Sequence, residues 1–512
     1  MKFLSRLEKT KAVWGVVALC VFFIFLRMPS VIEPYWYGDE GVYEVIGQAM
    51  NHGSMLYRDI WDNKPPLLYI LYALAQGDQP TVKIISLFVG FFTVIAFFFL
   101  SQKLFKKSYV SVLTTALLAL LFGTPLLEAN IANAENFILL PIILAGIIIY
   151  NLADQNKIKH LVTRNTKRVT LTSGLLLGVA FLFKIVAIFD LLAFLIFFWL
   201  VNLPQKDSWI SFKKALIRET KKGKQEPWFH SLFLTSCFLL LGFLLPLVIF
   251  MINFALHNAL GDFIQAAFFN NVDYVGYQNS LFGIPQGLLI FKIILLFIAL
   301  FFIVRNQNKL SKPALFITLW IVFALFNSYF SGRPYTHYAL VVVPSFCLLA
   351  GLLLDSQKKI KIVGGLIIVL IFFFFKFQIN ITRTYLYYQN AYKLITNKEN
   401  IVDYQTFFDQ KTPRDYAIAA FITSHTSSSD KVFIWGNDPQ IYVLSHKLPI
   451  GTYTVAYHIT ENNALDETQK LVNKERPKYI IVLKESEPLP IAAPLYIMRY
   501  STSGATIYER SF

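Results

Sequence analysis

The sequence predicts a polytopic α-helical membrane protein with a small α/β domain after its last span. Of the 512 residues, 55% are hydrophobic and only 15% are charged, which is too apolar for an ordinary soluble protein. Apolar runs near the length of about 20 residues that crosses a bilayer recur as far as residue 380. After residue 400 the apolar runs become short and strand-like.

About eleven apolar segments fit membrane-spanning helices. They cover residues 12–28, 81–100, 109–127, 137–153, 169–187, 190–203, 229–252, 285–304, 313–330, 338–354 and 362–380. The fifth and sixth segments are the least clearly divided. Arg27, Met28 and Pro29 follow the first apolar run where a cleavage site would need small residues, so we expect a retained anchor and not a signal peptide.

Basic residues gather in every second loop, which accounts for the net charge of +16. They include Lys2, Arg6, Lys9, Lys11, Lys103, Lys106, Lys107, Lys157, Lys159, Arg164, Lys167, Arg168, Lys206 to Lys224, Arg305, Lys309, Lys312, Lys358, Lys359 and Lys361. This alternation is typical of cytoplasmic loops and argues against a nucleic-acid-binding patch. We expect a multi-pass plasma-membrane protein with a cytoplasmic N-terminus and about 130 C-terminal residues outside the cell membrane.

The expected outer loops are acidic, and the longest of them, residues 29–80, contains two predicted short helices. Residues 40–50 have apolar side chains at helical spacing and are expected to lie along the membrane interface. Pro65 and Pro66 open a second apolar helix, which is too short to span and is expected to dock beside the second span. The three cysteines lie inside spans, so no disulfide or cysteine metal site is expected outside.

Residues 400–512 are predicted to form the extracytoplasmic α/β domain, and residues 1–385 the transmembrane domain. Thr412 and Pro413 are typical of a helix start, with threonine as the cap. Strands are expected at 431–435 and 478–483, a helix at 461–475 and a hairpin in the last residues. Because this domain has none of the charged motifs described below, we expect it to be accessory.

Three charged residues of loop 29–80 are candidates for chemistry. Asp39 is suited to act as a general base, although an aspartate at a helix start is also a common cap. Glu40 points about 100° away from Asp39 on a helix, so it is a candidate to position a substrate, bind a cation or favour the helix dipole. Lys64, before two prolines, is either a functional cation or an interfacial anchor paired with Asp62.

Later segments add more candidates on the same face. Lys184 lies within an apolar run, where a charge is costly and therefore a functional candidate; snorkelling or pairing with Asp190 is the alternative. The loop SGRPYTHY contains Arg333, His337 and Tyr338. An arginine in a short outer loop departs from the positive-inside rule, and its planar fork suits phosphate oxygens. Tyr338 also fits an interfacial aromatic residue.

These motifs resemble those of the GT-C glycosyltransferases that use polyprenyl-phosphate sugars, notably protein O-mannosyltransferases and lipid A aminoarabinose transferases. The acidic pair and the Lys-Pro-Pro of residues 38–69 are similar to the first outer loop of that family, and RPYTHY to its Arg-x-x-x-His-Tyr patch. Glu135 resembles the second-loop acid, although the aminoarabinose branch has an aspartate and this chain has Asn133 and Glu135.

The resemblance implies a GT-C fold and a division of roles among these residues. Asp39, Glu40 and Glu135 are the expected catalytic group. Lys64, Lys184, Arg333, His337 and Tyr338 are the expected donor-phosphate-binding group. No cofactor is expected, and the histidines show no metal-ligand spacing, so we expect no metal.

The expected function is transfer of a sugar from a polyprenyl-phosphate donor to a lipid, glycan or protein acceptor on the outer face. A phosphate leaving group departs without protonation, so one general base and several cations suffice. A ligase or polymerase that moves a preassembled glycan is the main alternative. A lipid flippase or transporter fits less well, because the polar residues gather at one face and the sequence shows no repeat, and a scaffold would not explain a lysine within a span.

Overall fold

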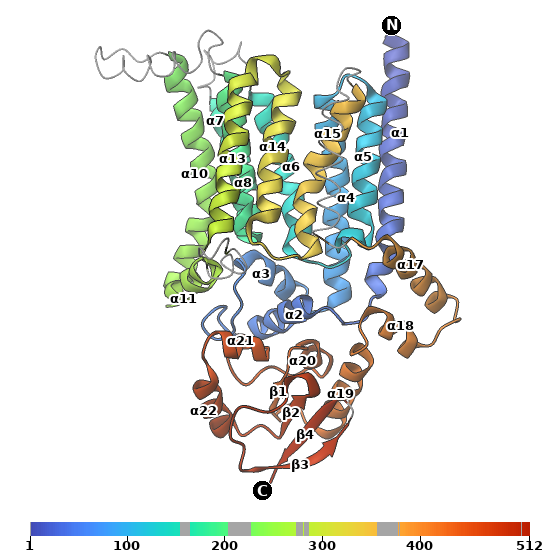
Figure 1. The fold of residues 1–512 in the computed structure, drawn as a ribbon, viewed down its shortest axis with the longest axis vertical. Helices are drawn as coiled ribbons and strands as arrows, with labels where there is room; N and C mark the ends of the chain where they lie inside the picture. Colours follow the sequence, from blue (N-terminus) through green and yellow to red (C-terminus); the bar gives the residue numbers. More distant parts are fainter. Residues whose placement is uncertain are drawn as a thin grey trace, which may run out of the picture.

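A computed structural model describes residues 2–153, 164–202, 227–272, 280, 286–355, 377, 379–502 and 504–511, with the backbone alone for 2–12, 164 and 227–229. The chain forms a bundle of long helices with a small α/β domain below one end (Figure 1). We call this the domain end of the bundle. The N-terminus lies at the opposite end, as does the basic connection of residues 103–107 between α4 and α5 (Figure 1).

The bundle is built from the apolar segments that the sequence marks. Its main helices are α1 (Lys2–Arg27), α4 (Gln79–Leu104), α5 (Ser108–Gly123), α6 (Ala134–Leu152), α7 (Arg164–Phe183), α8 (Ile188–Asn202), α10 (Pro227–Leu256), α13 (Gly287–Asn306), α14 (Lys312–Phe330) and α15 (Val343–Asp355). Among the described residues, nine helical segments are long and apolar enough to cross a membrane, and α5 is a shorter apolar helix. The expected number of about eleven is close to this, and nearly all of the predicted span 362–380 lies outside the described residues.

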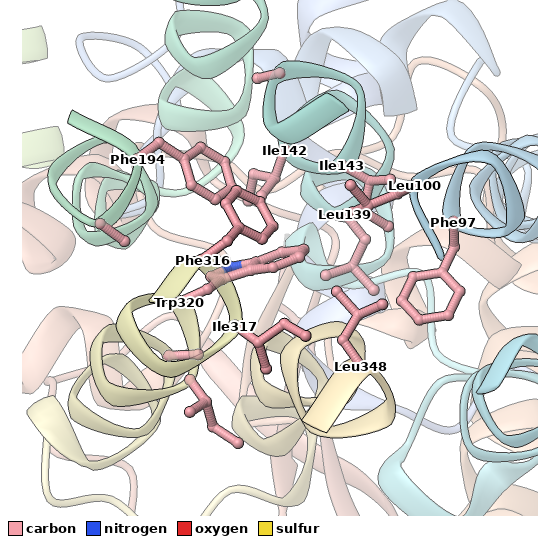
Figure 2. Packing of buried hydrophobic residues seen from close by; sticks show 14 of the residues in the cluster. Phe97, Leu100, Leu139, Ile142, Ile143, Phe194, Phe316, Ile317, Trp320 and Leu348 are labelled. Atoms are coloured by element: carbon pink, nitrogen blue, oxygen red, sulfur yellow. The ribbon is translucent and has the colours of Figure 1, made fainter. Parts of the chain in front are cut away.

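Aromatic and aliphatic side chains pack together in the core of the bundle (Figure 2). Trp320 of α14 is 1% exposed, and its ring centroid lies 5.3 Å from that of Phe194 on α8. Phe194 in turn stacks on Phe316 at 5.4 Å. The Trp320 indole donates a hydrogen bond of 2.8 Å to Asp190, so this buried polar pair is satisfied within an otherwise apolar core.

Short helices cross the domain end between the bundle and the α/β domain (Figure 1). They are η1 (Met28–Ile32), α2 (Gly38–Asn51) and α3 (Pro66–Leu74). Both predicted helices of this loop are confirmed, but α2 is enclosed and does not lie on an open interface. A Cβ at Gly47 would come within 2.7 Å of the Tyr72 backbone in α3, and one at Gly41 within 2.9 Å of Gln440 in the α/β domain.

Further short helices connect the long ones, most of them at this end of the bundle. They are η2 (Pro125–Leu127), η4 (Ile185–Ala187), α11 (Leu260–Ile264), the π-helical turn η5 (Gln265–Phe269), η6 (Gln307–Lys309, at the opposite end) and η7 (Thr336–Val342). After the last span, α17 (Ile381–Ile395) and α18 (Ile401–Phe408) lead towards the α/β domain. Phe408 of α18 packs on Trp36, with ring centroids 5.6 Å apart, so this connection is attached to the loop that carries α2.

The α/β domain contains a four-stranded sheet in the order β1-β2-β4-β3. Its elements are α19 (Thr412–His425), β1 (Val432–Trp435), α20 (Gln440–Leu444), α21 (Ala456–Glu461), α22 (Leu465–Glu475), β2 (Tyr479–Leu483), η8 (Lys484–Ser486), β3 (Tyr496–Ser501) and β4 (Ala505–Arg510). β1 pairs with β2 in parallel, and β4 is antiparallel to both β2 and β3. The predicted strands and terminal hairpin are confirmed.

Two local expectations for this domain need correction. The helix predicted at 461–475 is α22, which begins four residues later at Leu465, and a separate short helix, α21, precedes it. Thr412 is not the cap of α19, because the helix already includes it and Lys411 occupies the cap position. The Thr412 hydroxyl is buried and has no hydrogen-bond partner among the described residues.

Glu44 gives the enclosed helix α2 a pH-dependent stability. Its carboxyl group is fully buried without a hydrogen-bond partner among the described residues. Burial, reinforced by the charge of Glu40, raises the pKa of Glu44 well above its usual value. When the folded-state pKa of a carboxyl group is raised, the protein is most stable at pH values below the unfolded-state pKa of that group. Stability is then lost as the pH rises towards the folded-state pKa.

We expect Glu44→Gln to flatten the loss of stability between about pH 5 and pH 8 and to raise the melting temperature at the upper end. Thermal unfolding of detergent-purified protein at both pH values measures this. Glu467→Gln, at an exposed position of α22, is the matched control. Parallel pH profiles for wild type and Glu44→Gln would contradict the assignment.

Candidate active site

A cavity of about 390 Å³ lies between the domain end of the bundle and the α/β domain, with lining residues from both. Seven of the eight predicted site residues line it: Asp39, Lys64, Glu135, Lys184, Arg333, His337 and Tyr338. They come from five segments distributed over about 300 residues of the chain. The fold therefore brings into one pocket the charged groups that the sequence placed on one face.

Asp39 lies in the first turn of α2 and lines the cavity. The helix begins at Gly38 with Tyr37 in the cap position, and no side chain caps it. The capping role weighed for Asp39 is therefore not observed. Instead, its carboxylate accepts a hydrogen bond of 3.3 Å from the Tyr43 hydroxyl, and the helix N-terminus favours its negative charge.

Lys64 combines the two roles considered for it, because it pairs with Asp62 and also lines the cavity. Its Nζ lies 3.5 Å from Asp62 Oδ2 and 4.9 Å from the centre of the Tyr43 ring. Burial raises the pKa of Asp62, but the charge of Lys64, with smaller effects of His458 and hydrogen bonds, outweighs it and leaves that pKa below its usual value. Asp62 thus stays ionised and holds the lysine ammonium at the cavity wall.

Lys184 lies at the break between α7 and η4, where the chain leaves the helix and the ammonium can face the cavity. It donates a hydrogen bond to Glu135 Oε1 and lies 4.1 Å from the centre of the Tyr338 ring. The pairing with Asp190 that we considered is wrong, because Asp190 accepts from Trp320. Tyr338 therefore faces a cation inside the cavity.

His337 connects two acids, Glu128 before α6 and Glu135 in its first turn. Its Nε2 lies 3.8 Å from Glu135 Oε1, and its Nδ1 lies 2.8 Å from Glu128 Oε2. Arg333 follows a turn at Gly332, whose φ of +75° favours glycine. The segment SGRPYTHY thus supplies the cavity with a guanidinium and an imidazole.

Glu40 is the predicted site residue that does not line the cavity. It is 1% exposed and lies 3.0 Å from the Nζ of Lys83 on α4. Its other oxygen accepts a hydrogen bond of 2.7 Å from the backbone N–H of Ala132. Lys83 also contacts Glu33 at 3.1 Å. These contacts fix Glu40, and with it the neighbouring Asp39, relative to α4 and to the backbone at Ala132.

The sequence analysis missed the residues that the α/β domain adds to the cavity. Tyr457, His458 and Glu461 of α21 line the cavity, so the α/β domain, which was expected to be accessory, borders it. The backbone N–H of Trp61 donates a 2.9 Å hydrogen bond to the carbonyl of Thr452, which ties the domain to loop 29–80. α21 is short and has no charged motif, so only the tertiary fold reveals it.

In the described part of the chain, no cluster of three or more histidine, cysteine, aspartate or glutamate residues could hold a metal ion. Two acids of the cavity, Asp62 and Glu135, are paired with Lys64 and Lys184.

The described architecture defines a polytopic membrane protein with the GT-C fold. The chain is similar to the crystal structure of ArnT from Cupriavidus metallidurans bound to undecaprenyl phosphate, with a TM-score of 0.57 and 14% identity over 97% of both chains. The apo state of the same protein gives a TM-score of 0.56 with 14% identity, over 97% of this chain and 98% of that one. At this level of identity the likeness shows the fold.

A weaker likeness, at a TM-score of 0.49, links the chain to the archaeal oligosaccharyltransferase AglB from Archaeoglobus fulgidus. The identity is 13%, over 94% of this chain and 70% of that one. Neither a family model nor a curated protein matches the sequence.

We expect Lys83→Met to destabilise the protein by about 3–5 kcal/mol, because Glu33 and Glu40 would remain buried without their shared cation. The midpoint of chemical or thermal unfolding in detergent measures this loss. Lys103→Met, on the exposed C-terminal turn of the same helix, should change it by less than about 0.5 kcal/mol. Equal stability of the two variants would contradict the role given to the cluster.

Proposed function

We propose that the protein is a membrane glycosyltransferase that moves a sugar from a polyprenyl-phosphate donor to an acceptor hydroxyl or phosphate. The observation that carries this proposal is the cavity that gathers Asp39 with Lys64, Lys184 and Arg333 at the domain end. A carboxylate among several cations is the equipment needed to activate an acceptor and to bind a phosphate leaving group. The GT-C fold and a structural neighbour that is bound to undecaprenyl phosphate support the same choice.

Asp39 is the proposed general base. It would remove the proton from the acceptor as the acceptor oxygen forms a bond to the anomeric carbon of the sugar. The bond from that carbon to the phosphate oxygen breaks, and its electron pair stays on the phosphate. A phosphate needs no proton to depart, so a second carboxylic acid is unnecessary, and a single displacement inverts the anomeric configuration.

The cations are proposed to bind the donor phosphate and to stabilise the charge that develops on it. Arg333 offers a planar fork for two phosphate oxygens, whereas Lys64 and Lys184 act as point charges. His337 and Tyr338 border this group in the cavity. Glu135 holds Lys184 in place, which gives it a positioning role in addition to the catalytic one that the resemblance implies.

A lipid-linked donor also fits the sidedness that we propose from the basic loops. The connection 103–107 lies at the end of the bundle with the N-terminus, away from the cavity (Figure 1). If that end is cytoplasmic, as the positive-inside rule indicates, the cavity faces the outside of the cell membrane. Nucleotide sugars are absent there, so a polyprenyl phosphate in the bilayer would deliver the sugar.

We expect Asp39→Asn to lower the rate of sugar transfer about 10²–10⁴-fold, because the amide keeps the size of the side chain but cannot accept the proton. Transfer from labelled polyprenyl-phosphate sugars by purified protein measures the rate, and binding of polyprenyl phosphate should change little. Asp59→Asn, at a surface pair with Arg58 in the same loop, is the control. Retention of most activity in Asp39→Asn would place the base elsewhere.

We expect Arg333→Ala and Lys64→Ala each to weaken binding of polyprenyl phosphate about tenfold or more, since each removes a charge-assisted contact. Arg333→Lys should recover only part of this loss, because an ammonium cannot bind two oxygens as a fork. Competition between polyprenyl phosphate and the uncharged polyprenol measures the effect, with Arg58→Ala as an exposed control. If wild-type protein does not prefer the phosphate, the proposed function fails.

A further inference from the structure

We propose that α21 of the α/β domain forms the subsite for the sugar of the donor, with His458 as the residue that binds a sugar hydroxyl. This inference rests on the proposed function and deepens it. It assigns the two chemical parts of the donor to two parts of the fold: the phosphate to cations of the bundle and loop 29–80, and the sugar to the α/β domain.

α21 is held firmly over the cavity. The backbone N–H of Ala456 donates to Gly436 at 2.9 Å, and the N–H of Tyr457 donates to Asn437 Oδ1 at 3.1 Å. Both contacts join α21 to the turn that follows β1. These contacts hold the side chains of α21 at the wall of the cavity.

His458 has a buried nitrogen that no described residue satisfies. The residue is 4% exposed, and its Nδ1 has no hydrogen-bond partner among the described residues. Its Nε2 lies 3.9 Å from Asp62 Oδ1, which is too far for a hydrogen bond. A buried polar atom without a partner is costly, and because His458 lines the cavity, a bound ligand can supply the missing contact.

The charge state of His458 points to a hydroxyl ligand. Burial lowers the pKa of His458 to about 4, in spite of the nearby Asp62, so the imidazole is neutral at physiological pH. A neutral imidazole has one N–H donor and one acceptor nitrogen. A hydroxyl group can likewise both donate and accept a hydrogen bond, so it can pair with either nitrogen. A phosphate would instead favour the charged form, which this environment resists.

His458 is positioned to contact the sugar, which is the group bonded directly to the phosphate of the donor. Asp62 lies between His458 and Lys64, at 3.9 Å from the former and 3.5 Å from the latter. A group next to a phosphate on Lys64 would therefore reach α21. The Trp61 ring stands perpendicular to the imidazole at 4.9 Å, which fixes its orientation, and Glu461 adds a carboxylate acceptor at the rim.

The test compares the affinities of full-length protein for bare polyprenyl phosphate and for polyprenyl phosphates that carry mannose, glucose or aminoarabinose. We expect wild type to bind at least one sugar ester more tightly than the bare phosphate. His458→Ala should abolish this preference, a loss of about fivefold to fiftyfold, while it binds the bare phosphate within about twofold of wild type. His458→Asn should restore part of the preference, because an amide also offers a donor and an acceptor.

Glu461→Gln provides a second variant that should not disturb folding, since Glu461 is exposed. It should reduce the same preference for the sugar ester. His446→Asn and Glu467→Gln, both exposed on this domain and away from the cavity, should leave it unchanged. The inference is overturned if His458→Ala weakens both ligands equally, if neither α21 variant alters the preference, or if wild type prefers no sugar ester. Failure of the proposed function has another signature, namely equal binding of polyprenyl phosphate and polyprenol by wild type.

Discussion

The position of loop 29–80 depends on one buried ammonium group. Lys83 of α4 contacts Glu33 before α2, Glu40 within α2 and the carbonyl of Asn130 before α6. Ions removed from water need close partners, so these segments cannot separate from the bundle without exposing or unpairing a charge. The cluster thereby fixes α2 across the domain end, and this placement of α2 sets the position of Asp39.

The enclosed helix α2 also relates the two domains to each other. Its glycines allow close approach to α3 on one side and to Gln440 of α20 on the other, so the α/β domain rests on the helix that carries Asp39. The same docking brings α21 over the cavity. A movement of the α/β domain would therefore change both the outer wall of the cavity and the surroundings of the proposed base.

Local patterns allowed much of this structure to be predicted. The acidic pair, the Lys-Pro-Pro turn and the RPYTHY loop are short motifs, and hydrophobic runs mark the spans. Lys83 was overlooked, although a lysine at the start of an apolar run is itself a signal. His458 could not be found, because its role depends on contact with Asp62, almost 400 residues earlier in the chain, and only the packing of the α/β domain creates that contact.

The ion pairs within the cavity bear on how the proposed lipid donor would be selected from a bilayer that contains many other phosphate headgroups. Lys64 and Lys184 are each held by a carboxylate, Asp62 and Glu135. An incoming phosphate must compete with these acids for the lysines. The free energy of its binding is therefore only the difference between the new ionic contact and the one it replaces. Abundant phospholipids, which match the cavity only through their charge, gain little free energy from entering it. Selectivity then depends on contacts with the rest of the ligand.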